Sequence, residues 1–128
     1  MENNKICRNK CQFMGRLVAD AKKEISANGK TRTNFSIAVK NDYKSGDNWI
    51  QETLFLDCVA FDEKTEKLLG YMKKGREIVV YGRLKMNEYI SAKYQHKIKK
   101  PYLLIGAVDV MMDKTTLETM DKINNIFQ

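Results

Sequence analysis

Two stretches of the sequence place aromatic rings where the side chains of a β-strand would meet water. The first, Thr53 to Phe61, alternates between two sets of residues, as a strand does when its successive side chains point to opposite faces. One set is apolar and indicates a core: Leu54, Leu56, Cys58 and Ala60. The other set includes Phe55, Asp57 and Phe61, and a carboxylate between two rings indicates a face that is partly open to water.

The second stretch, Arg76 to Tyr89, combines rings with cations on one face. Its alternation predicts an inward set of Ile78, Val80, Gly82, Leu84 and Met86. The outward set is Tyr81, Arg83, Lys85, Asn87 and Tyr89. Because every nucleobase has a flat π-face and every phosphate a negative charge, rings beside lysine and arginine suit a single-stranded nucleic acid. Such a surface would bind without reading sequence.

Residues for covalent chemistry do not occur in any recognisable arrangement. The sequence has no nucleophile paired with a base, no glycine-rich phosphate loop and no paired-carboxylate motif. Its single histidine, His96, and its three cysteines do not form a zinc-binding set. Cys7 and Cys11 would share one face of a strand, where small apolar filler is their expected role. We therefore expect a protein that is not an enzyme and uses no metal or cofactor.

Size and charge restrict the class of partner. A chain of 128 residues is long enough for one domain with a core and too short for two ordinary ones. Its net charge of +7 favours a polyanionic partner. No apolar run approaches the roughly 20 residues of a membrane span. Residues 1–5 lack the apolar segment of a secretory signal, so we expect a cytoplasmic protein that enters no membrane.

Five strands and one helix are expected along the chain. The strands cover residues 9–18, 31–40, 53–61, 76–89 and 102–112. Gly15 indicates a bend in the first strand, and Asn28-Gly29 indicates a turn before the second, whereas residues 20–24 are charged and turn-like. Asp62 can cap a helix that runs through Met72 and stops at Gly75.

The connecting segments carry further rings. Residues 41–51 form a polar hairpin loop with Tyr43 and Trp49, and the indole either covers its own loop or faces a ligand. The basic connection at 90–101, which contains Tyr94, indicates a mobile hairpin arm or a solvated loop. Residues 113–128 have the spacing of a short amphipathic helix.

The order strand, strand, strand, helix, strand, strand is that of an OB-fold. Over residues 9–112 the chain resembles the bacterial single-stranded DNA-binding protein family. The blocks that carry the resemblance are Asn9-Lys10 through Gly15-Arg16-Leu17, Asn34 to Ala38, Val59 to Phe61, Tyr71 to Gly75, and Val80 to Leu84. It implies an all-β fold with one helix: an OB-fold, a five-stranded Greek-key barrel with the helix between strands 3 and 4. That domain would cover residues 1–112, followed by a tail at 113–128.

The resemblance also implies a set of DNA-binding residues. The four base-stacking positions of the family fall on Tyr43, Phe55, Phe61 and Tyr89, with Trp49, Tyr71 and Tyr94 as further candidates. Candidate phosphate contacts are Lys73, Arg83, Lys85, Lys93, Lys97, Lys99 and Lys100. Two acids depart from the family pattern: Asp57 replaces a common arginine and Glu63 a frequent lysine, and both oppose DNA electrostatically.

The implied function is sequence-independent binding and protection of single-stranded DNA in replication, recombination or repair. Two alternatives remain open: an OB-fold protein-interaction module with weak affinity for nucleic acid, and an RNA-binding barrel. The family also implies a homo-oligomer, a tetramer or a dimer. Relatives end in a long tail with an acidic tip that docks repair enzymes, and the resemblance does not extend to this tip, because residues 124–128 lack the run of aspartates. Such a short-tailed form would suit a phage, a plasmid or another mobile element.

Overall fold

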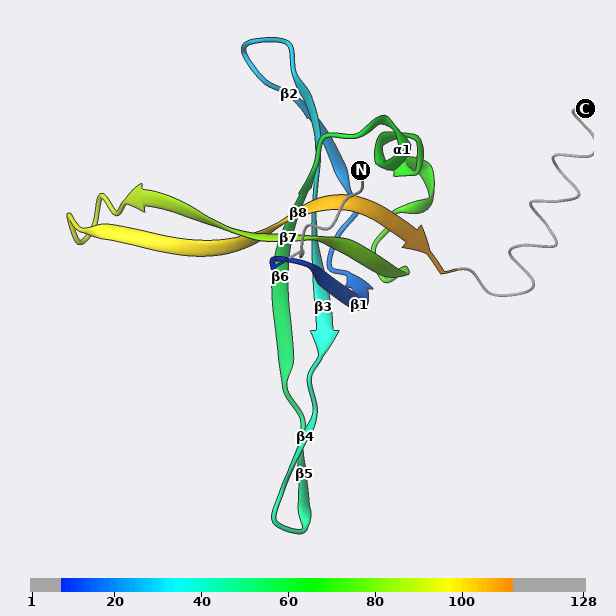
Figure 1. Ribbon diagram of the computed structural model, residues 1–128, viewed down its shortest axis with the longest axis vertical. Coiled ribbons are helices and arrows are strands. Elements are labelled where there is room, and N and C mark those ends of the chain that lie inside the picture. The colour runs from blue at the N-terminus through cyan, green and yellow to red at the C-terminus, as the bar shows by residue number, and fades with distance from the viewer. Residues whose placement is uncertain (1–7, 112–128) are drawn as a thin grey trace, which may run out of the picture.

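The computed structural model describes residues 8–111. Within that range the chain is mostly β, with one short α-helix and one 3-10 turn (Figure 1). The elements are β1 (Cys11–Leu17), β2 (Lys22–Ile25), β3 (Thr31–Lys40), β4 (Tyr43–Ser45), β5 (Asn48–Ile50), β6 (Thr53–Ala60), α1 (Glu63–Lys67), η1 (Leu69–Tyr71), β7 (Glu77–Ile90) and β8 (Lys97–Val110). The helix expected over residues 113–128 lies outside the described residues. No helix within 8–111 is long and apolar enough to cross a membrane.

Five of the strands close into a ring. The order is β1-β7-β8-β6-β3, and β3 returns to β1 through the pairs Arg16↔Ala38 and Leu17↔Ile37. β6 and β8 run parallel, and the other pairs in the ring are antiparallel. β2 adds to the outer edge of β3. With the helix between β6 and β7, the third and fourth strands of the ring, this is the predicted OB-fold, closed at β1–β3 by only those two residue pairs.

The core lies inside the ring and follows the predicted alternation. Phe35, Ile37 and Val39 of β3 face inward, as do Cys58 and Ala60 of β6. The remaining buried apolar residues are Leu17, Met72, Ile78, Val80, Leu103, Ile105 and Val108. Phe55 and Phe61 are exposed, so the expected division of β6 into an inner and an outer face is confirmed.

The helix begins as predicted and ends earlier. The carboxylate of Asp62 accepts a hydrogen bond from the backbone N–H of Thr65 at 3.0 Å, and this cap satisfies a donor of the first turn. α1 stops at Lys67, and the chain continues as the 3-10 turn η1, which delivers Met72 to the core. Gly75 follows with φ of 85°, a conformation that favours glycine.

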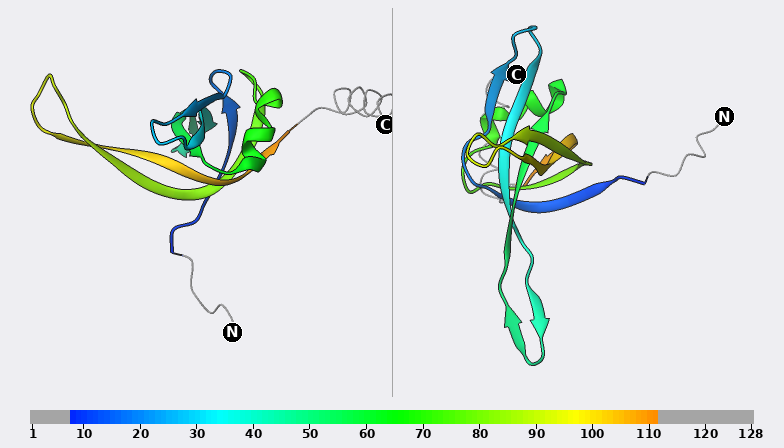
Figure 2. Two further views of the ribbon diagram at one scale, coloured as in Figure 1. Left: turned by 90° about the horizontal axis from the view of Figure 1, so that it is seen from above. Right: turned by 90° about the vertical axis from the view of Figure 1, so that its left-hand side faces the viewer.

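Besides the β2–β3 hairpin, two further hairpins extend from the ring (Figures 1 and 2). The finger, residues 41–52, is built on the β4–β5 pair. The arm, residues 84–102, consists of the parts of β7 and β8 beyond the ring, which pair as far as Ile90↔Lys97. The expected loop at 41–51 therefore contains two short strands, and the expected connection at 90–101 shortens to a turn, because β8 begins at Lys97 and not at Tyr102.

Two sequence-based expectations need correction. The alternation of β7 predicts that Leu84 and Met86 face the core, yet they are 44% and 52% exposed, because β7 has left the ring at that point. Residues 20–24 read as turn-like, but Lys22–Ile25 forms β2 and pairs with residues 31–34. The turn at Asn28-Gly29 that joins β2 to β3 is confirmed, with φ of 84° at Gly29.

A substitution at Gly82 tests how closely β7 packs against β8 in the ring. An added methyl group at Gly82 would overlap the carbonyl oxygen of Leu104, beside the register shift between β7 and β8. We expect Gly82→Ala to lower the free energy of unfolding by about 1–3 kcal/mol, the usual cost of overpacking. Gly70→Ala is the control, because a methyl group added at Gly70 would meet open space, and it should change stability by less than about 0.5 kcal/mol. Urea unfolding that gave equal stability for both variants would contradict this account.

Candidate nucleic-acid interface

One continuous surface is formed by the side chains of β3, β6, β8 and β7 that point away from the core. We call this surface the outer face. Strand register places Asn34 beside Val59, Ser36 beside Asp57 and Ala38 beside Phe55 on β3 and β6. On β7 and β8 it places Arg83 beside Leu104, Lys85 beside Tyr102, Asn87 beside Lys100 and Tyr89 beside Ile98. The outer face thus continues from the ring along one side of the arm.

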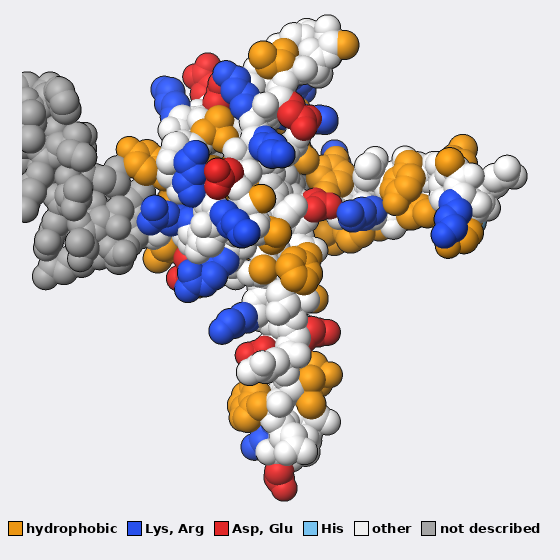
Figure 3. Space-filling view, turned by 180° about the vertical axis from the view of Figure 1, so that it is seen from behind, with side chains coloured by type: hydrophobic (Ala, Val, Ile, Leu, Met, Phe, Trp, Pro, Cys, Tyr) orange, Lys and Arg blue, Asp and Glu red, His pale blue; other side chains and the backbone are white. Residues whose placement is uncertain are grey.

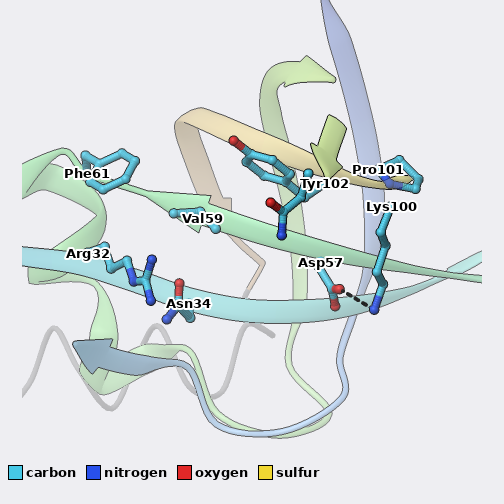
Figure 4. A pocket seen from close by; sticks show the side chains of 9 residues that line it. Arg32, Asn34, Asp57, Val59, Phe61, Lys100, Pro101 and Tyr102 are labelled. Atoms are coloured by element: carbon cyan, nitrogen blue, oxygen red, sulfur yellow. Dashed lines mark ion pairs between the residues drawn. The ribbon is translucent and has the colours of Figure 1, made fainter. Parts of the chain in front are cut away.

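A groove runs along this face where the arm leaves the ring. One hollow of about 340 Å³ is lined by Arg32, Asn34, Asp57, Val59, Phe61, Asn87, Lys100, Pro101 and Tyr102 (Figure 4). A second hollow of about 370 Å³ shares Asn34, Asp57 and Val59 with the first and reaches the loop that joins β1 to β2. Because the two hollows have these three residues in common, they lie side by side, and we call the pair the groove.

The four predicted stacking rings are all exposed, and three of them lie on the outer face. Phe55 projects from β6 and is 70% exposed, Phe61 directly follows the last residue of β6, and Tyr89 projects from the arm. The ammonium group of Lys30 lies 4.5 Å from the centroid of the Phe61 ring. Tyr43 stands apart on the finger, paired with Ile50. Stacking on these rings remains a prediction, which their exposure permits.

The three further candidate rings occupy different places. Trp49 is 69% exposed on the finger and so does not cover its own loop. It pairs with Lys44, on the opposite side of the finger from Tyr43. Tyr71 lies in η1, away from the two hollows. Tyr94 is exposed in the turn at the tip of the arm, with the ammonium of Lys93 at 5.3 Å from its ring centroid.

Most of the arm lysines predicted to contact phosphate already have carboxylate partners. The carboxylate of Glu88 lies 3.9 Å from the Nζ of Lys97 and 3.3 Å from that of Lys99. Lys97 and Lys99 sit on the side of the arm opposite the outer face, since they pair with Ile90 and Glu88 while Lys100 pairs with Asn87. Among residues 8–111, Lys93 has no carboxylate partner. These cations are therefore less available to a ligand than the sequence suggests.

The other candidate cations flank the groove. Arg83 lines a shallow hollow together with Phe61 and Leu104, and Lys85 shares the outer face with Tyr102. The Nζ of Lys73 is 3.9 Å from Oδ2 of Asp20, in the loop that borders the second hollow. Seen from behind, lysine and arginine side chains gather over the ring, whereas hydrophobic side chains cover much of the finger (Figure 3).

Asp57 is held in the groove by two groups. The hydroxyl of Ser36 donates to its Oδ1 at 2.8 Å, and the Nζ of Lys100 lies 3.1 Å from its Oδ2 (Figure 4). The hydrogen bond from Ser36, followed by that from Lys100, lowers the pKa of Asp57, so the carboxylate is ionised at neutral pH. The expected repulsion between Asp57 and DNA is thus partly compensated by Lys100, and the ion pair fastens the arm to β6.

Several residues of the groove, among them Arg32, Asn34 and Tyr102, are absent from the set expected from the sequence. Arg32 and Asn34 alternate with the buried Thr33 and Phe35, so their outward direction was readable from the pattern of β3. Arg32 donates through Nε and Nη2 to Glu24 Oε2 at 3.1 and 2.8 Å. Tyr102 stands at the start of an expected strand with no face assigned, although it precedes the buried Leu103. Within 8–111, no cluster of three or more potential ligands could hold a metal ion.

The ring of five strands, with the helix α1 between β6 and β7, defines an OB-fold protein whose outer face carries exposed aromatic side chains beside cations. Residues 8–111 match the model of the Single-strand binding protein family. The chain therefore belongs to this family.

Sequence and structure comparisons agree with this assignment. The Single-stranded DNA-binding protein of Borreliella burgdorferi is 36% identical over 81 residues, which are 63% of this chain and 54% of that protein. The protein of the same name from Fusobacterium nucleatum is 38% identical over 78 residues, 60% of this chain and 51% of that one. The chain thus matches about half the length of these curated relatives.

Two solved structures share the fold at low sequence identity. The Plasmodium falciparum SSB in its complex with ssDNA superposes with a TM-score of 0.74 at 19% identity, covering 86% of this chain and all of that one (100%). The small single-stranded DNA-binding protein from Streptomyces coelicolor gives a TM-score of 0.65 at 19% identity, covering 83% of this chain and 97% of that one.

Proposed function

We propose that the protein binds single-stranded DNA with little regard to sequence and so protects exposed strands during replication, recombination or repair. The observation that carries this proposal is the grooved outer face, where Phe55, Phe61 and Tyr102 share a surface with lysine and arginine. Flat rings stack on any base, and cations neutralise the phosphates between bases. The names of the curated relatives support the same ligand. The protein acts by binding and not by catalysis.

The arm completes the binding path. Lys85, Asn87 and Tyr89 extend the outer face beyond the ring, and Tyr94 with Lys93 continues it at the tip. A strand that follows this side would meet Lys85 and Lys100, and Lys100 now pairs with Asp57. A phosphate would then replace the carboxylate of Asp57 as the partner of Lys100, and this exchange gains less free energy than binding to a free cation.

We propose that the protein assembles as a homo-oligomer, a tetramer or a dimer, through β1. Within residues 8–111, β1 pairs with β7 along Cys11–Arg16, whereas β3 meets it only at Arg16 and Leu17. The other backbone edge of β1, over residues 11–15, is therefore unpaired and can add a strand from a second copy.

A single titration separates the proposed function from its alternatives. The fluorescence of Trp49 and the tyrosines should change on addition of oligo-dT, with much weaker binding of duplex DNA. Equal or tighter binding of oligo-rU would favour an RNA-binding barrel. No response to any of the three would indicate a protein-interaction module.

The exposed rings supply a test by substitution. Replacing Phe55, Phe61 or Tyr89 by Ala should each weaken oligo-dT binding by about 1–3 kcal/mol, the usual value of one stacked base, and should leave the thermal melt nearly unchanged because the rings are exposed. Ile90→Ala is the matched control, because Ile90 neighbours Tyr89 but points to the other side of the arm. Equal losses for Tyr89→Ala and Ile90→Ala would contradict binding along the outer face.

The arm lysines supply a second test, through salt dependence. Each phosphate contact adds about 0.7 to the slope of log affinity against log salt for a single strand. Changing Lys85, which lies on the outer face, and Lys93 together to Gln should therefore flatten the slope by up to about 1.4. The control is Lys64→Gln with Lys67→Gln, an equal loss of charge on α1 and outside both hollows. If both double variants gave the same slope, the arm would not contact phosphate.

Oligomerisation is testable by light scattering. One chain has a mass of 14.9 kDa, and the scattering mass at micromolar concentration should be two or four times larger. A monomer mass would reject assembly through β1.

A further inference from the structure

Asp57 lies among the rings that would hold bases. On β6 it follows Phe55 by two residues on the same face, so their side chains emerge about 7 Å apart. Tyr102 is its neighbour on β8, because Cys58 pairs with Leu103 in the parallel β6–β8 ladder. Both Asp57 and Tyr102 line the first hollow. A base stacked on Phe55 or on Tyr102 would therefore present an edge to this carboxylate.

The carboxylate is fixed in place and retains acceptor capacity. Ser36 donates to one oxygen and Lys100 pairs with the other, which restricts the rotation of the group. An ionised carboxylate has about four acceptor positions, so about two remain after these contacts. Its side chain is 48% exposed, and the free positions are open to a ligand.

This acceptor distinguishes between bases by their chemistry. Cytosine, adenine and guanine carry exocyclic amino groups that donate hydrogen bonds, whereas thymine presents carbonyl oxygens on both sides of its single N–H. A carboxylate accepts from an amino group and repels a carbonyl. Building on the proposed function, we propose that Asp57 biases the interface toward bases with an exocyclic amino group and against thymine.

The other polar groups of the hollow do not produce the same bias. Among the described residues, the side-chain amide of Asn87 has no hydrogen-bond partner, and an amide can both donate and accept, so it can pair with either kind of edge. Two N–H groups of Arg32 donate to Glu24, and its remaining N–H groups can donate to a carbonyl oxygen of cytosine or guanine as well as of thymine. Lys100 is paired with Asp57, and its other N–H groups are equally unselective among these carbonyl oxygens. Of the polar side chains that line the hollow, the carboxylate is the one that accepts hydrogen bonds and cannot donate them.

The experiment compares oligo-dC with oligo-dT of equal length on the full chain. Both are pyrimidines, so the stacking area is similar and the amino group is the main difference. In Asp57→Asn the dC-to-dT affinity ratio should fall by about fivefold or more, since a good base contact changes discrimination by at least about that factor. Release of Lys100 would act on both oligonucleotides alike and would not change the ratio.

Lys100→Gln is the matched control, because it breaks the same ion pair and keeps the carboxylate. Lys100→Gln should weaken the binding of both oligonucleotides and leave the dC-to-dT affinity ratio within about twofold of the wild-type value. An unchanged ratio in Asp57→Asn would overturn the proposal, and so would an equal shift in Lys100→Gln, which would assign the bias to the position of the arm. Wild-type protein that bound neither oligonucleotide would overturn the proposed function as well, whereas binding of both with no effect of Asp57→Asn would overturn only this inference.

Discussion

Closure of the ring at Leu17 is the constraint on which the rest of the structure depends. Its backbone N–H donates to the carbonyl of Arg76 at 2.9 Å, and its own carbonyl accepts from the N–H of Gly75 at 2.8 Å. The next residue, Val18, donates to the carbonyl of Ser36 in β3 at 3.0 Å. One short segment thus joins the first and last edges of the sheet, and the inward side chains of all five strands become buried together. The outward side chains are left to solvent, and they include the rings and cations of the outer face.

The sequence predicted most of the ring because alternation reports which side chains share a face. It placed Phe55 and Phe61 opposite Cys58 and Ala60 correctly, and Asp62 at the start of the helix. Alternation does not report what covers a face. Leu84 and Met86 continue the inward pattern of Ile78 and Val80, but the ring no longer lies beneath them. Where β7 leaves the ring depends on the other strands, so local sequence could not show it.

The positions of the aromatic side chains in the candidate site were predictable from the sequence, whereas the partners of its charged side chains were less so. Exposed aromatic residues on an amphipathic strand stand out in the sequence, whereas Tyr102 was missed because its strand was expected to begin there. The partners of the arm lysines depend on cross-strand register: Glu88 meets Lys99 because the hairpin turns at residues 91–96. A shift of one residue would move these lysines to the other side of the arm. The net charge of the chain therefore overestimates how many lysine and arginine side chains are available to a ligand.

The length of the arm makes it a lever. From Leu84 to Ile90, β7 continues for seven residues beyond the ring, and the two ends of this segment are about 20 Å apart at the usual rise of a strand. A change of about 10° in the twist of the sheet at Leu84 would move the tip by about 3.5 Å, roughly the thickness of one stacked base. The Asp57–Lys100 pair holds the arm between its base and its tip, so a small displacement at the pair becomes a larger one at the tip. The aromatic side chains at the tip of the arm therefore change position when the twist of the five-stranded sheet changes.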